Sequence, residues 1–346
     1  MKILSIFVDM VRANRLKLFE PSIKKSNKLD NLLQDIGGTV FTNHITPGPD
    51  TTRALASYFS GKPPWQNGCD ARNKTAFSFL DSKLKTNIDI FDDYNYDQFF
   101  FADPGEFEQI FPKNFRLHKH NKDFDLNKFI EDITLTDYSH LFIALPDFHS
   151  SLDDYGANLF GEKIGYSKLV SSLSIIFNKF KPDTFDYIIL FSDHGFKLSK
   201  ESRKQRQKRK LHLFDEDRMR PILFIREKDQ KKLKYDDRMI SLSDLQKIYL
   251  NILKGNSNQI LSLPERKFVC FEDHIDFSYF NFMKTEVFGL VNKNHFYVRS
   301  FSDSLLLDRK GEFISSKLNK KYNYILFNET SYGQKFEFTQ KILKSN

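Results

Sequence analysis

The sequence predicts an α/β fold: a mostly parallel β-sheet sandwiched by helices, with a small C-terminal antiparallel sheet. Short continuous apolar runs of strand length alternate with segments of helical periodicity, which is the pattern of buried parallel strands joined by crossover helices. From about residue 266 the pattern changes to short alternating runs separated by turn residues. We therefore expect a large α/β domain over residues 1–262 and a small antiparallel β subdomain over residues 263–346.

The elements of the large domain follow from its apolar runs in chain order. Residues 3–9 (ILSIFVD) are expected to form a strand that ends in a carboxylate, and helical spacing follows at about residues 26–36. Residues 37–46 (GGTVFTNHIT) predict a second strand, after which the loop TPGPD leads into a helix that begins at Thr51. The other expected elements are strands at 139–147, 185–195 and 220–225 and helices at 161–180 and 241–253.

The subdomain is predicted from alternation rather than from continuous apolar runs. A helix near residues 333–344 is expected to close it. The segments expected to form its strands are 266–273 (RKFVCFED), 285–301 (TEVFGLVNKNHFYVRSF), 304–315 (SLLLDRKGEFIS) and 322–327 (YNYILF).

The composition excludes several classes of protein. At 346 residues and 40% hydrophobic residues, the chain can bury a full core and disorder is not expected. Its longest apolar runs fall well short of the ~20 residues that a membrane span needs, and Asp9 interrupts the apolar N-terminus, which argues against a signal peptide. Cys69 and Cys270 are too few for a disulfide framework or a thiolate metal cluster, so we expect a cytoplasmic protein.

Three of the predicted strands end in aspartate, and this is the chemical signal of the sequence. Asp9, Asp147 and Asp193 each close an apolar run, and His194 follows Asp193 directly. A single such aspartate is more often a helix cap or a turn residue. Three strand ends with an adjacent histidine instead favour a divalent cation, which needs several oxygen ligands and accepts imidazole.

Three segments resemble the alkaline phosphatase, sulfatase and nucleotide pyrophosphatase superfamily, in matching order over about residues 3–225. They are IFVDMVRAN, FTNHITPGPDTTRALASYFSGKPPWQNG and LFSDHG. The resemblance implies an alkaline-phosphatase-like fold in which Asp9, a nucleophile at a helix start, Asp193 and His194 share one metal ion. It also implies a second metal site, held by a further aspartate and two histidines.

The resemblance places the nucleophile at Thr51, ten residues before Gly61, as in the family; Thr52 is the alternative. A helix N-terminus suits this role, because its exposed N–H groups and dipole stabilise phosphate oxygens and a nearby alkoxide. A threonine at this place can also simply cap the helix, and the two roles are compatible.

The reaction class follows from the same segment. Family sulfatases mature a Cys or Ser in a C/S-x-P-x-R motif, whereas this loop reads PDTTR, so the resemblance implies phosphorus chemistry: a phosphotransferase or phosphodiesterase with a phospho-threonine intermediate. Arg53 and, more weakly, Asn73 are candidates to bind a nonbridging oxygen, although a surface role for Arg53 is an equal alternative. A sulfatase-like or phosphonate ester hydrolase remains an alternative.

The second metal site matches the family less closely. Asp147 and His212 fit two of its ligands, but position 151 is serine where the family has histidine. We expect Asp147, His149 and His212 to hold this ion, with Asp153 in reserve. The cofactor is therefore one or two divalent cations, Zn or Mn first and Mg or Ca as alternatives.

A basic run separates the candidate ligands His194 and His212. Residues 197–210 contain eight of the 53 Lys and Arg residues and one acidic residue, Glu201, in a chain whose net charge is +8. Such a run is usually a solvated loop, but here it can also attract an anionic substrate, with Lys210 as a contact, or an anionic membrane surface. Nucleic acid is disfavoured because no binding motif accompanies the charge.

These properties predict an anionic phosphorylated small molecule or glycan as substrate, with decoration of surface polysaccharide as one setting. A non-catalytic anion-binding module on the same fold is the alternative outside enzymology.

Overall fold

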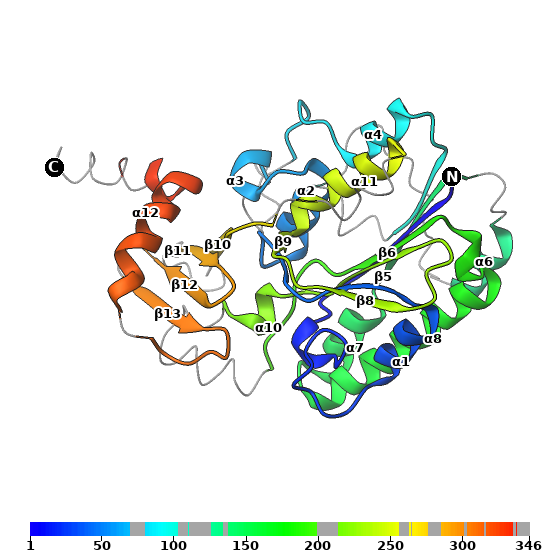
Figure 1. The fold of residues 1–346 in the computed structure, drawn as a ribbon, viewed down its shortest axis with the longest axis horizontal. Coiled ribbons are helices and arrows are strands. Elements are labelled where there is room, and N and C mark those ends of the chain that lie inside the picture. Colours follow the sequence, from blue (N-terminus) through cyan, green and yellow to red (C-terminus); the bar gives the residue numbers. More distant parts are fainter. Residues whose placement is uncertain are drawn as a thin grey trace.

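The computed structural model describes residues 1–69, 80–102, 110, 126–133, 138–198, 214–255, 263, 265–275, 285–300, 303–314, 316–334 and 337. Figure 1 shows a large sheet with helices on both sides and, next to it, a smaller sheet with its own helix. The predicted fold class is confirmed: the large sheet has seven strands and is mostly parallel, and the small one has four strands and is antiparallel.

The large sheet has its most buried strands at its centre. Its order is β4 (Gln98–Phe101), β5 (His140–Leu145), β1 (Ile3–Val8), β6 (Tyr187–Phe191), β7 (Leu223–Glu227), β2 (Gly38–Phe41) and β8 (Leu233–Asp236). β7 runs antiparallel to both of its neighbours, and the other pairs are parallel. Every residue of β1, β5 and β6 is buried, which explains why these strands read as continuous apolar runs.

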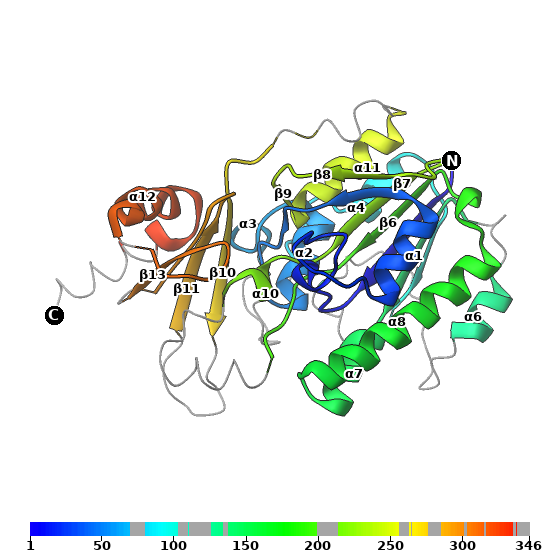
Figure 2. The ribbon, with the colours of Figure 1, turned by 60° about the horizontal axis from the view of Figure 1, so that its bottom comes forward.

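Helices cover both faces of this sheet (Figures 1 and 2). One face packs against α1 (Lys28–Ile36), α6 (Leu126–Asp132), α7 (Asp147–Tyr155) and α8 (Leu159–Lys179). The other packs against α2 (Thr51–Ser60), α4 (Asn87–Asp93) and α11 (Leu245–Leu253). Short elements connect these layers: α3 (Pro64–Asn67), α10 (Glu216–Met219), the parallel pair β3 (His44–Ile45) and β9 (Ile240–Ser241), and 3-10 turns at Ala13–Arg15, Pro182–Thr184 and Leu242–Asp244.

The helix beginning at Thr51 has defined signals at both ends. Asp50 is its N-cap, and the Asp50 carboxylate accepts a 3.3 Å hydrogen bond from the Arg53 N–H. Gly61 ends the helix in the left-handed region, at φ 64°, where a Cβ would come within 2.4 Å of the Gln246 side chain. Both ends of α2 are therefore fixed by local sequence.

The small sheet is a meander of four consecutive strands. Its strands are β10 (Val269–Ile275), β11 (Thr285–Val291), β12 (His295–Arg299) and β13 (Ser304–Asp308), and a 3-10 turn (Ser316–Leu318) leads into α12 (Asn319–Glu329). One face shares a core with Ile45, Phe214, Met219 and Met239 of the large α/β region, and the other packs against α12. The predicted boundary between residues 262 and 263 precedes β10 and stays a prediction.

One expected strand is a helix. YNYILF (322–327) lies in α12, where Tyr322 and Leu326 are buried four residues apart and Tyr324 is 73% exposed. Six residues are too few to separate alternation from helical spacing, which explains the error. The closing helix predicted near 333–344 lies largely outside the described residues. The edge strands β4 and β8 were not predicted.

None of the described helices is long and apolar enough to cross a membrane.

Candidate active site

Three ligand-type side chains meet at the carboxyl ends of two neighbouring parallel strands. Asp9 follows β1, and Asp193 and His194 follow β6, which pairs with β1 in parallel. Each offers one ligand atom, and these atoms lie within 4.8 Å of one another. All three residues are buried, with 2%, 0% and 5% of their surface exposed. This edge is where open α/β sheets bind their ligands.

The backbone at Met10, directly after Asp9, is strained and contacts the Asp193 carboxylate. Met10 has φ 65°, which costs a residue with a side chain of order 1–3 kcal/mol. In this conformation the Met10 N–H donates a 3.2 Å hydrogen bond to Asp193 Oδ1, which also accepts a 2.7 Å hydrogen bond from the His194 N–H. The strained turn therefore ties the end of β1 to the Asp193 carboxylate.

The remaining carboxylate oxygens fit a cation. Asp193 Oδ2 and Asp9 Oδ1 are buried, and neither has a hydrogen-bond partner within the described part of the chain. Asp9 Oδ2 faces His149 Nδ1 at 2.8 Å. Because a buried carboxylate oxygen without a partner is costly, two such atoms side by side call for a positive charge between them.

His194 is prepared to act as a neutral ligand. Its Nδ1 lies 2.7 Å from the Gly195 carbonyl, which can only accept, so Nδ1 carries the proton and Nε2 keeps its lone pair. Burial is the largest influence on this imidazole and lowers its pKa to about 4. Gly195 is required because a Cβ there would lie 2.0 Å from the Asp217 carbonyl oxygen. Nε2 is thus available to a metal ion at neutral pH.

The pKa shifts of Asp9 and Asp193 also favour a cation at this site. Burial alone would raise the pKa of Asp9, but contacts with His149 and His194 outweigh it, and this pKa is lowered. The pKa of Asp193 is raised well above its ordinary value, first by burial and then by the negative charge of Asp9. A divalent cation would remove this conflict, so the donor set fits the ion that the sequence predicts.

Thr51 brings a hydroxyl to the same place. It is the first residue of α2, and its Oγ1 lies 3.4 Å from His194 Nε2. The Thr51 hydroxyl also acts on the Asp193 carboxyl, whose pKa it pulls down against the larger effect of burial. Among the described residues, no hydrogen bond joins the Thr52 side chain to this cluster. The geometry therefore favours Thr51 over Thr52.

The residues predicted for a second metal ion are not grouped in the described part of the chain. Asp147 is the first residue of α7, and its Oδ1 accepts a 3.0 Å hydrogen bond from Ser172 in α8. His149 turns to Asp9 instead, and its Nε2 lies 3.6 Å from Asp153 Oδ2. His212, Lys210 and Asn73 lie outside the described residues. The second ion stays a prediction.

Arg53 has a different setting from the one expected of a substrate contact. It is 1% exposed, and its guanidinium is ion-paired with Asp50 and with Asp273 of β10. Its Nη1 also lies 3.4 Å from the Glu272 carbonyl oxygen. The structure thus gives Arg53 two buried carboxylate partners, and a contact with substrate stays a prediction.

Arg218 was not singled out from the sequence, yet it lies beside the cluster. Its Nε donates a 3.0 Å hydrogen bond to the Pro49 carbonyl, two residues before Thr51, and its own carbonyl accepts a 2.8 Å hydrogen bond from the Gly195 N–H. Its positive charge contributes to the lowered pKa of His194. The segment DEDRMRP gives no motif that distinguishes Arg218 from Arg220, so only the fold reveals it.

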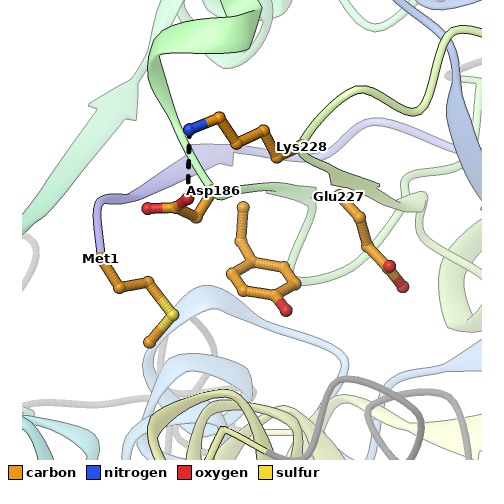
Figure 3. Close-up of a pocket in the computed structure, with 5 residues that line it drawn as sticks. Met1, Asp186, Glu227 and Lys228 are labelled. Carbon is orange, nitrogen blue, oxygen red and sulfur yellow. Dashed lines mark ion pairs between the residues drawn. The ribbon is translucent and has the colours of Figure 1, made fainter.

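At the other end of the sheet, the described residues form no comparable group of ligand-type side chains. Figure 3 shows a hollow near the start of β1 and β6, where Lys228 lies 3.6 Å from Asp186 and Met1 forms part of the wall. This hollow is at the amino ends of the strands, away from Asp9.

No family model matches the sequence, and no curated protein matches it. Solved structures do match. A 2-O GAG sulfatase superposes with a TM-score of 0.70 at 12% identity, over 99% of this chain and 91% of that chain. A phosphonate monoester hydrolase from Silicibacter pomeroyi gives 0.65 at 12% identity, over 99% and 94% of the two chains. A protein in the alkaline phosphatase superfamily from Vibrio parahaemolyticus gives 0.57 at 15% identity, over 92% and 83%.

At these identities the likeness concerns the fold. It extends over nearly the whole chain and includes both the large sheet and the small one. The protein therefore has the fold seen in the alkaline phosphatase and sulfatase superfamily, and the fold that the resemblance implied is confirmed.

Proposed function

We propose that this protein is a metal-dependent phosphoric-ester hydrolase or phosphotransferase with Thr51 as its nucleophile. The observation that carries the proposal is the Thr51 hydroxyl, which lies 3.4 Å from His194 Nε2 at the start of α2, beside two buried carboxylates. Ester hydrolysis is supported by the fold neighbours, which include a sulfatase and phosphonate monoester hydrolases. A shared fold does not determine the reaction, so the reaction is argued from the side chains of this protein.

Asp9, Asp193 and His194 would hold the cation in this proposal. A bound divalent ion lowers the pKa of a hydroxyl and neutralises charge on a phosphoryl group. Two carboxylates and one imidazole suit Zn or Mn, with Mg or Ca as harder alternatives. A second ion, at Asp147 and His149 with His212, belongs to the same proposal.

The chemical step uses the chain's own groups. Thr51 Oγ1 forms a bond to phosphorus while the bond from phosphorus to the leaving oxygen breaks, and the proton lost by Thr51 is balanced by the one that the leaving oxygen gains. The first-turn N–H groups of α2 and the charge of Arg218 stabilise the nonbridging oxygens. Water or an acceptor hydroxyl then attacks phospho-Thr51 and frees the threonine.

The identity of the nucleophile favours phosphorus over sulfur. The sulfatase route of the family needs a Cys or Ser at this place, and the chain has Thr51 and Thr52. The substrate that we propose is an anionic phosphorylated small molecule or glycan, since a bound divalent ion attracts phosphoryl oxygens and the chain carries a net charge of +8. A cytoplasmic setting, peripheral contact with a membrane through residues 197–210, and a role in polysaccharide modification stay predictions.

Phosphonate ester hydrolysis is the second candidate. It is favoured by two phosphonate monoester hydrolases among the fold neighbours, with TM-scores of 0.65 and 0.60. The attacked atom is still phosphorus, so the same site serves both reactions and only the substrate distinguishes them.

A direct assay tests the reaction class. Hydrolysis of p-nitrophenyl phosphate, bis(p-nitrophenyl) phosphate, p-nitrophenyl phenylphosphonate and p-nitrophenyl sulfate would be measured with added Mn²⁺ or Zn²⁺. We expect turnover of phosphorus esters and little turnover of the sulfate. Sulfate turnover above that of every phosphorus ester would reject the proposal.

Mass spectrometry tests the intermediate. The peptide that contains Thr51 and Thr52 would be analysed after rapid acid quench during turnover. A phosphoryl adduct on Thr51 is expected, and an unmodified peptide at saturating substrate, with product formed in a burst, would contradict the covalent mechanism.

A further inference from the structure

We propose that the C-terminal sheet positions the nucleophile, and that Arg53 and Asp273 are the positioning residues through which it does so. The inference rests on the proposed function, because it concerns the placement of Thr51. The small sheet would therefore act in a reaction that takes place at the edge of the large sheet. Among the described residues, none of the small sheet belongs to the cluster of Asp9, Asp193 and His194.

The first contact is an ion-paired group that joins the two regions, which we call the arginine clamp: Asp50, Arg53 and Asp273. Arg53 Nε donates a 2.5 Å hydrogen bond to Asp50 Oδ2, and its guanidinium also pairs with the Asp273 carboxylate of β10. Asp50 and Arg53 are 4% and 1% exposed, and Asp273 is 8% exposed. The attraction between the two regions is therefore little screened by solvent.

One member of the clamp, Asp50, directly precedes the proposed nucleophile Thr51. Asp50 is the N-cap of α2, its carbonyl accepts the 3.0 Å hydrogen bond from Ala54, and Thr51 follows it directly. The Asp50 side chain therefore links the clamp to the first turn, in which Thr51 Oγ1 lies 3.4 Å from His194 Nε2. A displacement of about 1 Å at such a group can cost two orders of magnitude in rate.

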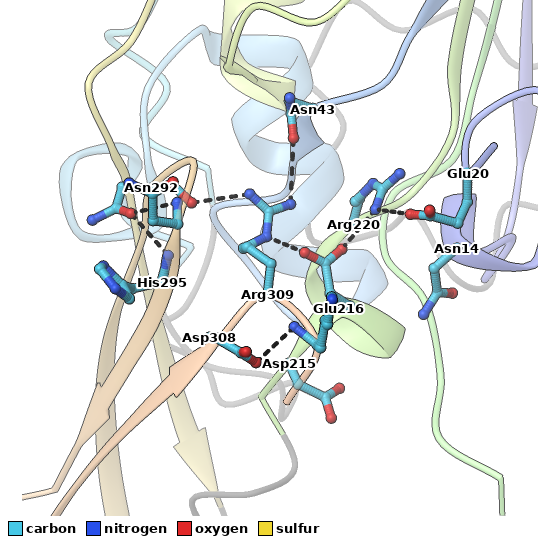
Figure 4. Close-up of polar contacts among 12 residues, drawn as sticks. Asn14, Glu20, Asn43, Asp215, Glu216, Arg220, Asn292, His295, Asp308 and Arg309 are labelled. Atoms are coloured by element: carbon cyan, nitrogen blue, oxygen red, sulfur yellow. Dashed lines mark hydrogen bonds and ion pairs between the residues drawn. The ribbon is translucent and has the colours of Figure 1, made fainter. Parts of the chain in front are cut away.

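A second contact ties the small sheet to α10 (Figure 4). Arg309, just after β13, pairs with the Glu216 carboxylate, which also accepts a 3.1 Å hydrogen bond from Arg220. Arg309 Nη1 donates a 2.9 Å hydrogen bond to the Asn292 carbonyl within the small sheet. Glu216 begins α10, the helix that carries Arg218. The small sheet thus holds both α2 and α10.

The charges make the clamp sensitive to conservative change. Burial alone would lower the pKa of Arg53, but Asp273 and Asp50 outweigh it and raise that pKa, so the group is charged at all working pH values. A lysine keeps the charge but lacks the planar fork that reaches two carboxylates at once. An asparagine at 273 keeps the shape and removes half of the balancing negative charge.

The experiment compares Arg53→Lys and Asp273→Asn with Arg226→Lys in the full-length, metal-loaded protein. Arg226 is a matched control: it is 2% exposed, donates to the carbonyls of Ile36 and Pro182 at 2.9 and 3.1 Å, and pairs with Asp183, far from the cluster. We expect the two clamp variants to lower kcat about 10- to 100-fold with KM within about threefold. The control should lower Tm alone.

Hydrogen exchange gives a readout that does not require activity. The backbone amides of residues 53–55, at the start of α2, should exchange faster in Asp273→Asn than in the wild type, while those of β6 stay unchanged. If the wild type is active and the clamp variants keep the kcat of the Arg226→Lys control, the inference is wrong. If the wild type is inactive, the proposed function fails and exchange decides alone: unchanged amides at 53–55 in Asp273→Asn would overturn the clamp.

Discussion

Asp9 and Asp147 follow two strands that lie side by side, yet their surroundings differ. β1 and β5 pair in parallel from Ile3 to Val8, so both aspartates leave the sheet at the same edge. Asp9 enters a strained turn and is 2% exposed, and its carboxylate faces the Asp193 side of the cluster. Asp147 begins α7 at once, and its carboxylate accepts a hydrogen bond from Ser172.

This difference teaches that a strand-end aspartate is only a candidate. Where the chain enters a helix at once, as at Asp147, one carboxylate oxygen accepts a hydrogen bond from the neighbouring helix, and the other is buried without a hydrogen-bond partner among the described residues. When the chain makes a tight, strained turn instead, the carboxylate is held at the edge of the sheet. The sequence shows the aspartate in both cases, but it does not show the turn.

The largest expected effect concerns Thr51, the proposed nucleophile beside the Asp9 cluster. Thr51→Ala should lower kcat about 10³-fold or more, because the covalent step is lost, whereas Thr52→Ala should change kcat less than about fivefold. Steady-state kinetics with the best phosphate ester, and circular dichroism to verify folding, would measure this. Equal losses in the two variants would mean that the α2 start matters but that Thr51 is not its reactive group.

The next effect compares the two aspartates directly. Asp9→Asn should weaken Mn²⁺ binding at the site of Asp9, Asp193 and His194 by more than about 100-fold, because it removes a ligand of that ion, whereas Asp147→Asn should weaken binding at this site by less than about tenfold. Isothermal titration or electron paramagnetic resonance of free Mn²⁺ would give both constants. An equally large loss at this site in Asp147→Asn would contradict the prediction and show that Asp147 also acts on the first ion.

The smallest effect concerns folding rather than the reaction and uses His140, the first residue of β5. Burial lowers its pKa to about 3, so the folded protein keeps it neutral while the unfolded chain binds a proton below about pH 6.5. Stability contributed in this way is present above pH 6.5 and is lost as pH falls, by about 2 kcal/mol between pH 7.5 and 5.

Urea unfolding at pH 7.5 and pH 5.0 would test this prediction. In His140→Asn the drop in unfolding free energy between the two pH values should be smaller than in the wild type by about 2 kcal/mol. An equal drop in both proteins would show that His140 is protonated in the folded state.

Much of the fold was predictable because its central strands are buried on both faces. Runs such as HLFIAL in β5 and YIILF in β6 are buried along their whole length, and the helix predicted at 161–180 lies between them as α8; α7, which precedes it, was not predicted. Edge strands carry less signal: β8, with the sequence LKYD, is half exposed and was missed. The antiparallel direction of β7 depends on the connection that precedes it, which apolar spacing does not encode.

The candidate site likewise contains residues that the sequence predicts and residues that only the folded chain reveals. Asp9, Asp193, His194 and Thr51 sit at strand ends and at a helix start, which are places that local sequence defines. The setting of Arg53 was not predictable, because its partner Asp273 is 220 residues away in the chain. Arg218 was not predicted as a site residue for the same reason: its contacts with Pro49 and Gly195 exist only once the chain has folded.

The arginine clamp also has a consequence for the order in which the protein becomes competent during synthesis. The ribosome releases Asp9, Thr51 and His194 long before Asp273, so the large sheet can fold while the first turn of α2 still lacks one of its two anchors. If the proposed roles hold, a nascent chain would have its metal ligands in place early and its nucleophile aligned late. Translation of β10, which carries Asp273, would then be the step that completes the site.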